Sequence, residues 1–164
     1  MRQPDNLSAK IYDLPQLLRQ VEHWRKNNGT IAFTNGCFDI LHEGHIYSLF
    51  QAAQEADYLI VAINSDNSVK KLKGSKRPIN KETSRAIVVA ALAMVDAVII
   101  FDDETPLHVI SKILPNVLVK GGDYTMNQIA GSKEVIAAGG KVVINPILTG
   151  YSTTALIEKF QTKI

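Results

Sequence analysis

The sequence has only one cysteine, Cys37, among its 164 residues. A single cysteine cannot form an intrachain disulfide, so the class of small secreted proteins stabilised by disulfides is excluded and a reducing cytosol is expected. No apolar run approaches the roughly 20 residues that a membrane-spanning helix needs. Residues 1–6 also lack the apolar core of a signal peptide. We therefore expect a cytoplasmic protein with no membrane partner.

Neither sign of charge is in excess, since 18 basic and 16 acidic residues give a net charge of +2 at pH 7. This balance provides no overall attraction to nucleic acid or to anionic membranes. One basic run, over residues 70–77, is compatible with a nucleic-acid patch, a solvated surface or a loop that contacts phosphates. Because nothing else in the sequence favours nucleic acid, we predict no nucleic-acid partner.

Short apolar runs alternate with amphipathic segments, and 46% of the residues are hydrophobic, as in ordinary globular proteins. We predict five strands, over residues 30–33, 58–63, 97–101, 117–119 and 142–144. The pattern predicts one doubly wound, Rossmann-like α/β domain over residues 11–164, with a five-stranded, mostly parallel sheet. Residues 1–10 are expected to be a loosely ordered N-terminal segment.

The predicted helices begin at recognisable caps or end at glycine. Four helices are expected to start after Asp13, Asn80, Thr105 and Ser152. A fifth follows the segment 34–45 and ends near residue 55, and a sixth covers residues 131–138. Residues 64–80 are expected to form a polar loop. In the helix after Asn80, four side chains are expected to face inward: Ile87, Ala90, Ala91 and Met94.

Residues 34–45 connect a predicted strand to a predicted helix and contain two histidines, His42 and His45, on either side of Gly44. In an open α/β sheet, ligands bind where the strands end, and a helix N-terminus favours phosphate. The two rings could ligate a metal, cap the helix or donate to a phosphate chain. A glycine between them leaves room for a nucleotide, and no Cys/His cluster supports zinc. We assign no metal site to the protein.

Residues 36–45 read Gly-Cys-Phe-Asp-Ile-Leu-His-Glu-Gly-His and resemble the G-x-F-D-x-x-H-x-G-H signature of the cytidylyltransferase-like nucleotidyltransferase superfamily. Its HIGH-type domain is similar to class I aminoacyl-tRNA synthetases at this site. Members join a nucleoside monophosphate, from ATP or CTP, to a phosphorylated acceptor and release pyrophosphate. The resemblance implies that His42 and His45 are catalytic and bind the phosphate chain. Cys37 has no neighbouring base motif and no partner cysteine, so we interpret it as a small packed residue and not as a nucleophile.

The resemblance also implies cationic site residues. Lys73, chosen from the basic run, and Arg85 would contact the phosphates as catalytic residues, although Arg85 could also be a plain surface residue. Lys73 and Arg77 would bind the acceptor substrate. Asp39 would orient the loop or contact the substrate rather than act as a base.

Three segments are predicted to bind the nucleotide: the strand end before the histidines, the turn at residues 120–124, and the last helix start, which resembles the family's I-S-T-T element. The turn could instead be a tight turn capped by aspartate. Lys159 stands where the family often has arginine, and we leave it out of the site. The predicted nucleotide-binding residues are Thr34, Asn35, Gly36, Phe38, Gly44, Gly121, Gly122, Asp123, Ser152, Thr153 and Thr154.

Further segments, including residues 61–66, 72–74, 77–80, 118–124 and 129–135, look like the heptose 1-phosphate adenylyltransferase family in its stand-alone form, without a sugar kinase domain. This implies AMP transfer from ATP, with Mg²⁺, to D-glycero-β-D-manno-heptose 1-phosphate. The ADP-heptose would be used for the lipopolysaccharide core or a related surface glycan. The rival readings are a cytidylyltransferase for glycerol 3-phosphate or an amino-alcohol phosphate, and a non-catalytic nucleotide sensor. A homodimer is possible.

Overall fold

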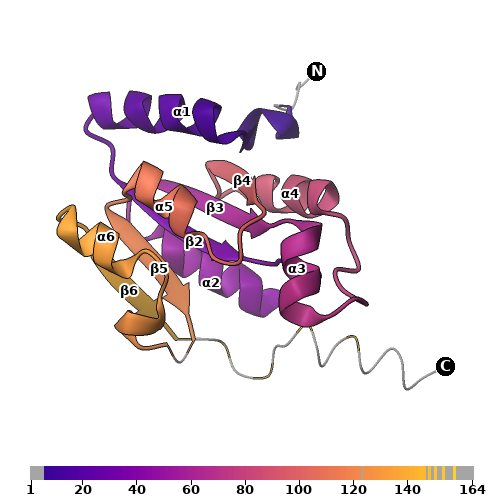
Figure 1. Ribbon diagram of the computed structural model, residues 1–164. Helices are drawn as coiled ribbons and strands as arrows, with labels where there is room; N and C mark the ends of the chain where they lie inside the picture. The colour runs from indigo at the N-terminus through magenta and orange to yellow at the C-terminus, as the bar shows by residue number, and fades with distance from the viewer. Residues whose placement is uncertain are drawn as a thin grey trace.

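The computed structural model describes residues 6–122, 124–146, 148, 150, 153 and 157. Its centre is a parallel sheet whose strands run in the order β1-β4-β3-β2-β5-β6 (Figure 1). Along the chain, β3 and then β4 are added on one side of β2, and β5 and then β6 are added on its other side. This reversal makes the sheet doubly wound. The strands are β1 (Ile11–Tyr12), β2 (Ile31–Gly36), β3 (Tyr58–Asn64), β4 (Ala97–Phe101), β5 (Val117–Gly121) and β6 (Lys141–Asn145).

The prediction of a parallel, Rossmann-like α/β sheet is confirmed, but the prediction of five strands is wrong because the described residues form six. The missed strand is β1, which pairs with β4 through Val98 and Ile99 at the sheet edge. Two residues are too few for a hydrophobic period to show in the sequence. The preceding residues form the 3₁₀-helix η1 (Leu7–Lys10), and the domain start at residue 11 stays a prediction.

One side of the sheet, which we call the α5 face, is covered by α1 (Leu14–Lys26), α5 (Leu107–Ile113) and α6 (Ser132–Ala137) (Figure 1). Beneath these helices lies a buried apolar cluster that includes Phe33 of β2 and Leu118 of β5. The cap predicted for the first helix is confirmed, because the Asp13 carboxylate accepts a hydrogen bond from the backbone of Gln16 at 2.8 Å.

The opposite side, the α2 face, is covered by α2 (Glu43–Ala53) and α4 (Glu82–Ala90). Its buried cluster includes Phe38, Leu49 of α2 and Val119 of β5. Adjacent residues of β5 therefore point into different clusters, as the alternation of side chains along a strand requires. A strand buried on both faces reads as a continuous apolar run, which is why the sequence located the central strands well.

The helix α3 (Asp66–Lys73) lies within the segment that the sequence predicts to be a loop, so that prediction is wrong. Ser65 caps this helix by accepting a hydrogen bond from the Ser68 backbone at 3.0 Å. Only Ser68 and Val69 are buried, and the last turn is basic. Such a short buried stripe gives no helical apolar period in the sequence.

The predicted cap and inward face of the next helix also need correction. Lys81, rather than Asn80, is the N-cap of α4, because Asn80 makes its hydrogen bonds with Asp39 instead. Ile87 is 42% exposed and Ala91 is also exposed. The residues of α4 that are buried are Arg85, Ala86, Val89 and Ala90.

The starts of two later helices were also predicted. Pro106, not Thr105, is the N-cap of α5. The cap predicted at Ser152 lies outside the described residues, while Thr153 and Ile157 are helical. The helix predicted after residue 130 is confirmed as α6.

Candidate functional site

A cavity of about 640 Å³ opens at the carboxyl ends of β2, β3 and β5. It brings together segments from residue 34 to residue 153, and it contains twelve of the predicted site residues. These are Thr34, Asn35, Gly36, Phe38, Asp39, His42, Gly44, His45, Lys73, Arg77, Gly121 and Thr153. Arg85 and Gly122 do not line it, and Asp123, Ser152 and Thr154 lie outside the described residues.

The loop after β2 carries the two histidines to the start of α2. His42 is the N-cap residue of α2, but its ring makes no capping hydrogen bond. The backbone N–H groups of the first turn of a helix have no partners within that helix, and the helix dipole is positive there. The start of α2 therefore offers an anion both backbone and side-chain donors on one wall of the cavity.

The two imidazoles stack on each other, with ring centroids 3.9 Å apart and an angle of 24° between the planes. The edge of Phe38 meets His45 at 5.4 Å between centroids. Phe38 adopts a positive φ of 46°, and a Cβ on Gly36 would lie 3.0 Å from its ring. Gly36 thus makes room for the ring that supports His45, a role that the sequence does not reveal.

Burial changes the protonation of this pair. It lowers the pKa of His42, and together with the charge of His42 it lowers the pKa of His45 from 6.5 to about 4. Both rings are therefore neutral at pH 7 in the free protein. Nδ1 of His45 is buried and has no hydrogen-bond partner among the described residues. A phosphate in the cavity would favour the charged rings, so we expect phosphate to raise both pKa values.

We expect the free protein to lose stability as the pH falls from 6.5 to 4. Because the folded-state pKa of His45 lies below its unfolded value of 6.5, the unfolded chain binds the extra proton in this window. Urea unfolding at pH 7, 5.5 and 4.5 measures this loss. The His45→Asn protein should show a shallower slope, with His42 supplying the rest, and an equal slope in both proteins would contradict the assignment.

Asp39 anchors the segment that follows α3. Its carboxylate is only 4% exposed and accepts hydrogen bonds from the backbone of Ile79 at 2.9 Å and Asn80 at 2.8 Å, and from Arg77 Nε at 2.7 Å. Burial alone would raise the pKa of Asp39, but these three donors outweigh it and hold that pKa below 3.8. Both oxygens are engaged, so the geometry favours the loop-orienting alternative over contact with substrate.

Arg85 was predicted to contact phosphates, but the structure places it beneath the cavity. The residue is 2% exposed and donates to the carbonyl of Cys37 at 2.6 Å, the carbonyl of Asn80 at 3.0 Å and the carboxylate of Asp66 at 2.8 Å. These contacts connect the histidine loop, the start of α3 and the start of α4. We therefore correct its role to that of a positioning residue, since the sequence could not show which face of α4 is buried.

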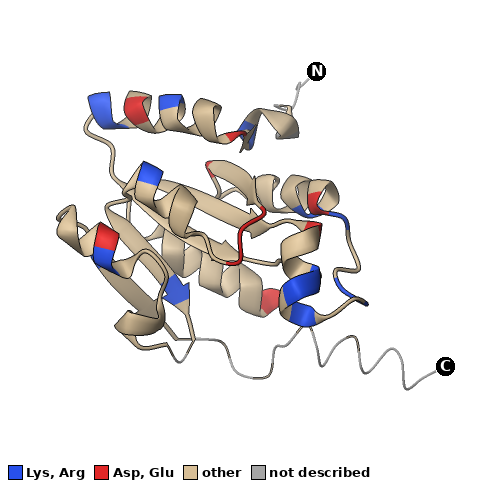
Figure 2. Cartoon of the chain, in the orientation of Figure 1, with Lys and Arg blue, Asp and Glu red and all other residues tan. Residues whose placement is uncertain are grey.

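Lys73 is the last residue of α3 and lines the cavity with an exposed side chain. The end of α3 carries three basic residues, and Figure 2 shows this end of the helix in blue. A cation is also favoured at the negative end of the helix dipole. Lys73 thus lines the cavity in which the phosphates are expected to bind, while its contact with a phosphate stays a prediction.

A family model of cytidylyltransferase-like proteins matches residues 33–159, which include the strand, the histidine loop and the whole described cavity wall. This chain belongs to the cytidylyltransferase-like family. The match covers more than half of the chain and begins inside β2.

Curated relatives of this cytidylyltransferase-like chain include two proteins named bifunctional protein HldE. The protein from Hyphomonas neptunium is 53% identical over 94% of the chain, and the protein from Koribacter versatilis is 55% identical over 92%. The chain spans only about a third of the length of these relatives, 32% and 31%.

Solved structures share the fold. A lipopolysaccharide core biosynthesis protein from Thermoplasma volcanium aligns over 76% of this chain and 99% of its own, with a TM-score of 0.61 and 25% identity. A pantoate-beta-alanine ligase from Francisella tularensis aligns over 94% of this chain and 78% of its own, with a TM-score of 0.60. At 17% identity, the ligase supports the cytidylyltransferase-like fold alone.

Several cavity residues of this cytidylyltransferase-like domain were not predicted as site residues. Lys120 is the first residue of the predicted turn at residues 120–124, and its position at a strand end was the signal that could have identified it. The others lie in α2, at the end of β3, in the 3₁₀-helix η2 (Met126–Gln128) and in loops, which only the fold brings together. They include Ser48, Asn64, Glu104, Thr105, Pro106, Tyr124, Gln128, Ile129, Ala130 and Leu148.

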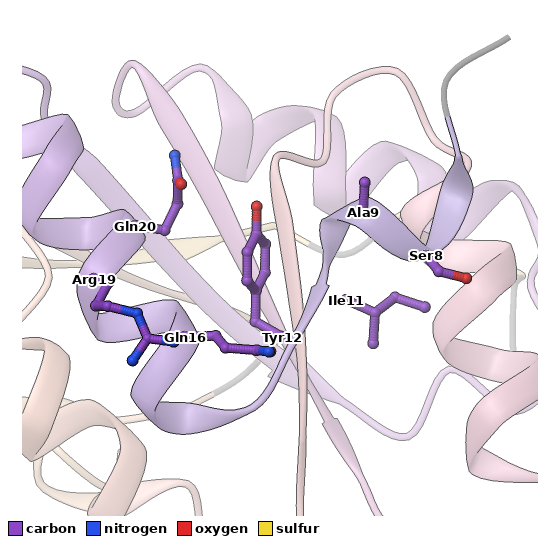
Figure 3. A pocket seen from close by; sticks show the side chains of 7 residues that line it. All are labelled: Ser8, Ala9, Ile11, Tyr12, Gln16, Arg19 and Gln20. Atoms are coloured by element: carbon purple, nitrogen blue, oxygen red, sulfur yellow. The ribbon is translucent and has the colours of Figure 1, made fainter.

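Three other features of the described structure concern metal sites, membrane-spanning helices and a further hollow. Across the described ranges, no group of three His, Cys, Asp or Glu side chains could hold a metal ion. No described helix has the length and hydropathy needed to cross a bilayer. A second hollow of about 440 Å³ lies between η1, β1 and α1, where Tyr12 and Arg19 line it (Figure 3). None of its lining residues is a predicted site residue.

Proposed function

We propose that this domain transfers AMP from ATP to a sugar 1-phosphate, D-glycero-β-D-manno-heptose 1-phosphate, to give ADP-heptose and pyrophosphate. The observation that carries the proposal is the stacked histidine pair at the start of α2, on the wall of a cavity that Lys73 and Arg77 also line. The family match supports nucleotidyl transfer. The choice of ATP and heptose follows the resemblance of residues 118–124 and 129–135, supported by the relatives named HldE.

The chemistry needs no protein nucleophile. An oxygen of the acceptor phosphate, already ionised near pH 7, attacks the α-phosphorus of ATP, and the bond to the pyrophosphate oxygen breaks. The protein's contribution is to align the two phosphates and to neutralise their charge. We assign phosphate donation to His42 and His45 and charge neutralisation to Lys73 and Arg77. Thr153, whose hydroxyl donates to the carbonyl of Ile40 at 3.4 Å, closes the cavity beside the histidine loop.

We propose that Mg²⁺ enters with ATP and is held mainly by its phosphates, as is usual for this ion. The substrates then are Mg–ATP and the sugar phosphate, and we propose that the domain acts in the cytoplasm, where both are available. Removing Mg²⁺ with EDTA should abolish turnover, and adding it back should restore the rate.

Pyrophosphate release tests the proposed function directly. The protein is incubated with ATP or CTP and, in turn, with heptose 1-phosphate, glycerol 3-phosphate and ethanolamine phosphate. We expect release only with ATP and heptose 1-phosphate. Turnover with CTP but not ATP would replace the proposal by a cytidylyltransferase, and ATP binding without turnover on any acceptor would favour a nucleotide sensor.

A further inference from the structure

Two polar side chains, Asn35 and Lys120, project from the ends of the two central strands onto the α5 face. In the register of β2 and β5, Phe33 is opposite Leu118, and both belong to the apolar cluster of that face. Two residues further on, Asn35 and Lys120 point the same way, since side chains alternate along a strand. Lys120 Nζ donates to Asn35 Oδ1 at 3.1 Å, which agrees with this register.

The histidines approach the same cavity from the other side. Phe38, whose edge contacts His45, belongs to the cluster of the α2 face. Both His45 and Lys120 line the cavity, which therefore continues around the ends of the central strands. Gly36 and Gly121 are the last residues of β2 and β5 and also line it. The Phe38 ring takes the side-chain space of Gly36, so the two faces are connected by the cavity itself, which both His45 and Lys120 line.

Lys120 is a largely buried cation that forms no ion pair with a carboxylate of the described residues. Its ammonium group bonds Asn35 and lies 5.4 Å from the centroid of the Tyr124 ring. None of the ion pairs found in the described part of the chain includes it. Burial lowers the pKa of Lys120, as expected for a charge removed from water. Burying a charge in this way is costly unless a ligand anion compensates it.

Other residues that line the cavity suit a small polyhydroxylated molecule. Glu104 and Thr105, from the loop between β4 and α5, offer a carboxylate and a hydroxyl. Pro106 and Ile129 add apolar surface, and Ile129 belongs to the apolar cluster of the α5 face. Gln128, its neighbour in the chain, also lines the cavity. Carboxylate oxygens accept hydrogen bonds from sugar hydroxyls, whereas an apolar and cationic floor alone would not select them.

We propose that the part of the cavity on the α5 face is the acceptor subsite, in which Lys120 binds the phosphate of the incoming sugar phosphate. This inference rests on the proposed nucleotidyl transfer. The nucleotide phosphates occupy the α2 face at the histidines, and the acceptor phosphate approaches from the α5 face through the same cavity. Its oxygen forms the new bond to the α-phosphorus as pyrophosphate departs, and Lys120 stays protonated throughout. Lys120 thus lowers the repulsion between the two phosphates before they react.

Binding measurements on a charge-neutral variant test the subsite. We expect Lys120→Met to weaken heptose 1-phosphate binding at least tenfold, measured by calorimetry on protein saturated with α,β-methylene-ATP, and to leave the affinity for the ATP analogue within twofold. Lys120→Arg should restore most of the loss. Lys112→Met is the matched control, because it removes the same charge from an exposed position on α5. A loss of ATP affinity with unchanged acceptor affinity would overturn the proposal.

A second variant adds charge instead of removing it. Asn35→Asp would place a carboxylate beside Lys120 and pair with the ammonium group that the acceptor phosphate needs. We expect the acceptor affinity to fall at least tenfold, while urea unfolding stays as cooperative as in the wild type. Normal acceptor binding in this variant would contradict the role of Lys120.

Failure of the proposed function can be told apart from failure of the subsite. If wild-type protein neither binds nor uses heptose 1-phosphate, the proposed function is wrong. The subsite is then tested with inorganic phosphate, titrated into the analogue-bound protein and followed by NMR of the lysine side chains. Phosphate binding that depends on Lys120 would retain the subsite for another acceptor. No binding by wild type, or equal binding by Lys120→Met, would reject it.

Discussion

Replacing His45 with alanine is expected to lower kcat by about 10²–10³, the usual effect of losing one donor to a transition-state oxyanion. In the free protein Nδ1 of the buried ring has no described partner, and stacking on His42 and the edge of Phe38 fix the ring plane. A donor held in place before the substrate arrives needs no reorganisation as charge develops on the α-phosphate. The effect should therefore fall on kcat more than on KM.

The control for this experiment is His23→Ala, which removes an exposed histidine from α1. It should leave both kcat and KM unchanged. Thermal unfolding of His45→Ala separates a catalytic loss from a packing loss, because the ring also supports Phe38. If His45→Ala keeps its fold and its rate, the ring has no role in the reaction.

Replacing Asp39 with alanine is expected to lower the free energy of unfolding by about 3 kcal/mol, the range for breaking a buried ion pair by removing one partner. The backbone N–H groups of Ile79 and Asn80 would lose the Asp39 carboxylate that accepts their hydrogen bonds. Arg77 would lose its partner at 2.7 Å. Because this segment leads back to Lys73, we also expect KM for the acceptor to rise.

Urea unfolding at pH 7 measures the stability change. Glu22→Ala is the control, since its ion pair with Lys26 is exposed on both sides and should make no measurable difference. Asp39→Asn keeps the shape but weakens every hydrogen bond to the charged carboxylate, so it should fall between wild type and Asp39→Ala. Wild-type stability in Asp39→Ala would show that residues 77–80 are held by other contacts.

The sequence could not show which of two cations, Arg85 or Lys120, reaches the cavity. Both are cations near the end of a strand or the start of a helix, and the resemblance assigned the phosphate to Arg85. In the structure Arg85 bonds Cys37 and Asp66, which lie 48 and 19 residues away, while Lys120 bonds Asn35, 85 residues away. The partners of a cation decide whether it reaches the cavity, and no local pattern encodes partners so distant.

The helix caps likewise differ in whether the sequence could predict them. The cap of α1 was predictable because Asp13 and Gln16 satisfy each other within one turn. The cap of α4 was not, because Asn80 bonds Asp39, 41 residues earlier in the chain. The short helix α3 and the two-residue strand β1 depend on the elements they pack against, and neither is long enough to produce a period.

The sequence by itself determined the alternation of strands and helices, the parallel sheet and the histidine pair at the start of α2. These features depend on short-range periodicity and on a contiguous motif, so a linear reading contains them. Only the tertiary structure decided that Arg85 lies beneath the cavity, that Asp39 anchors residues 77–80 and that Lys120 faces the side opposite the histidines. The physical reason is that sheet register and long-range hydrogen bonds set the direction of each side chain.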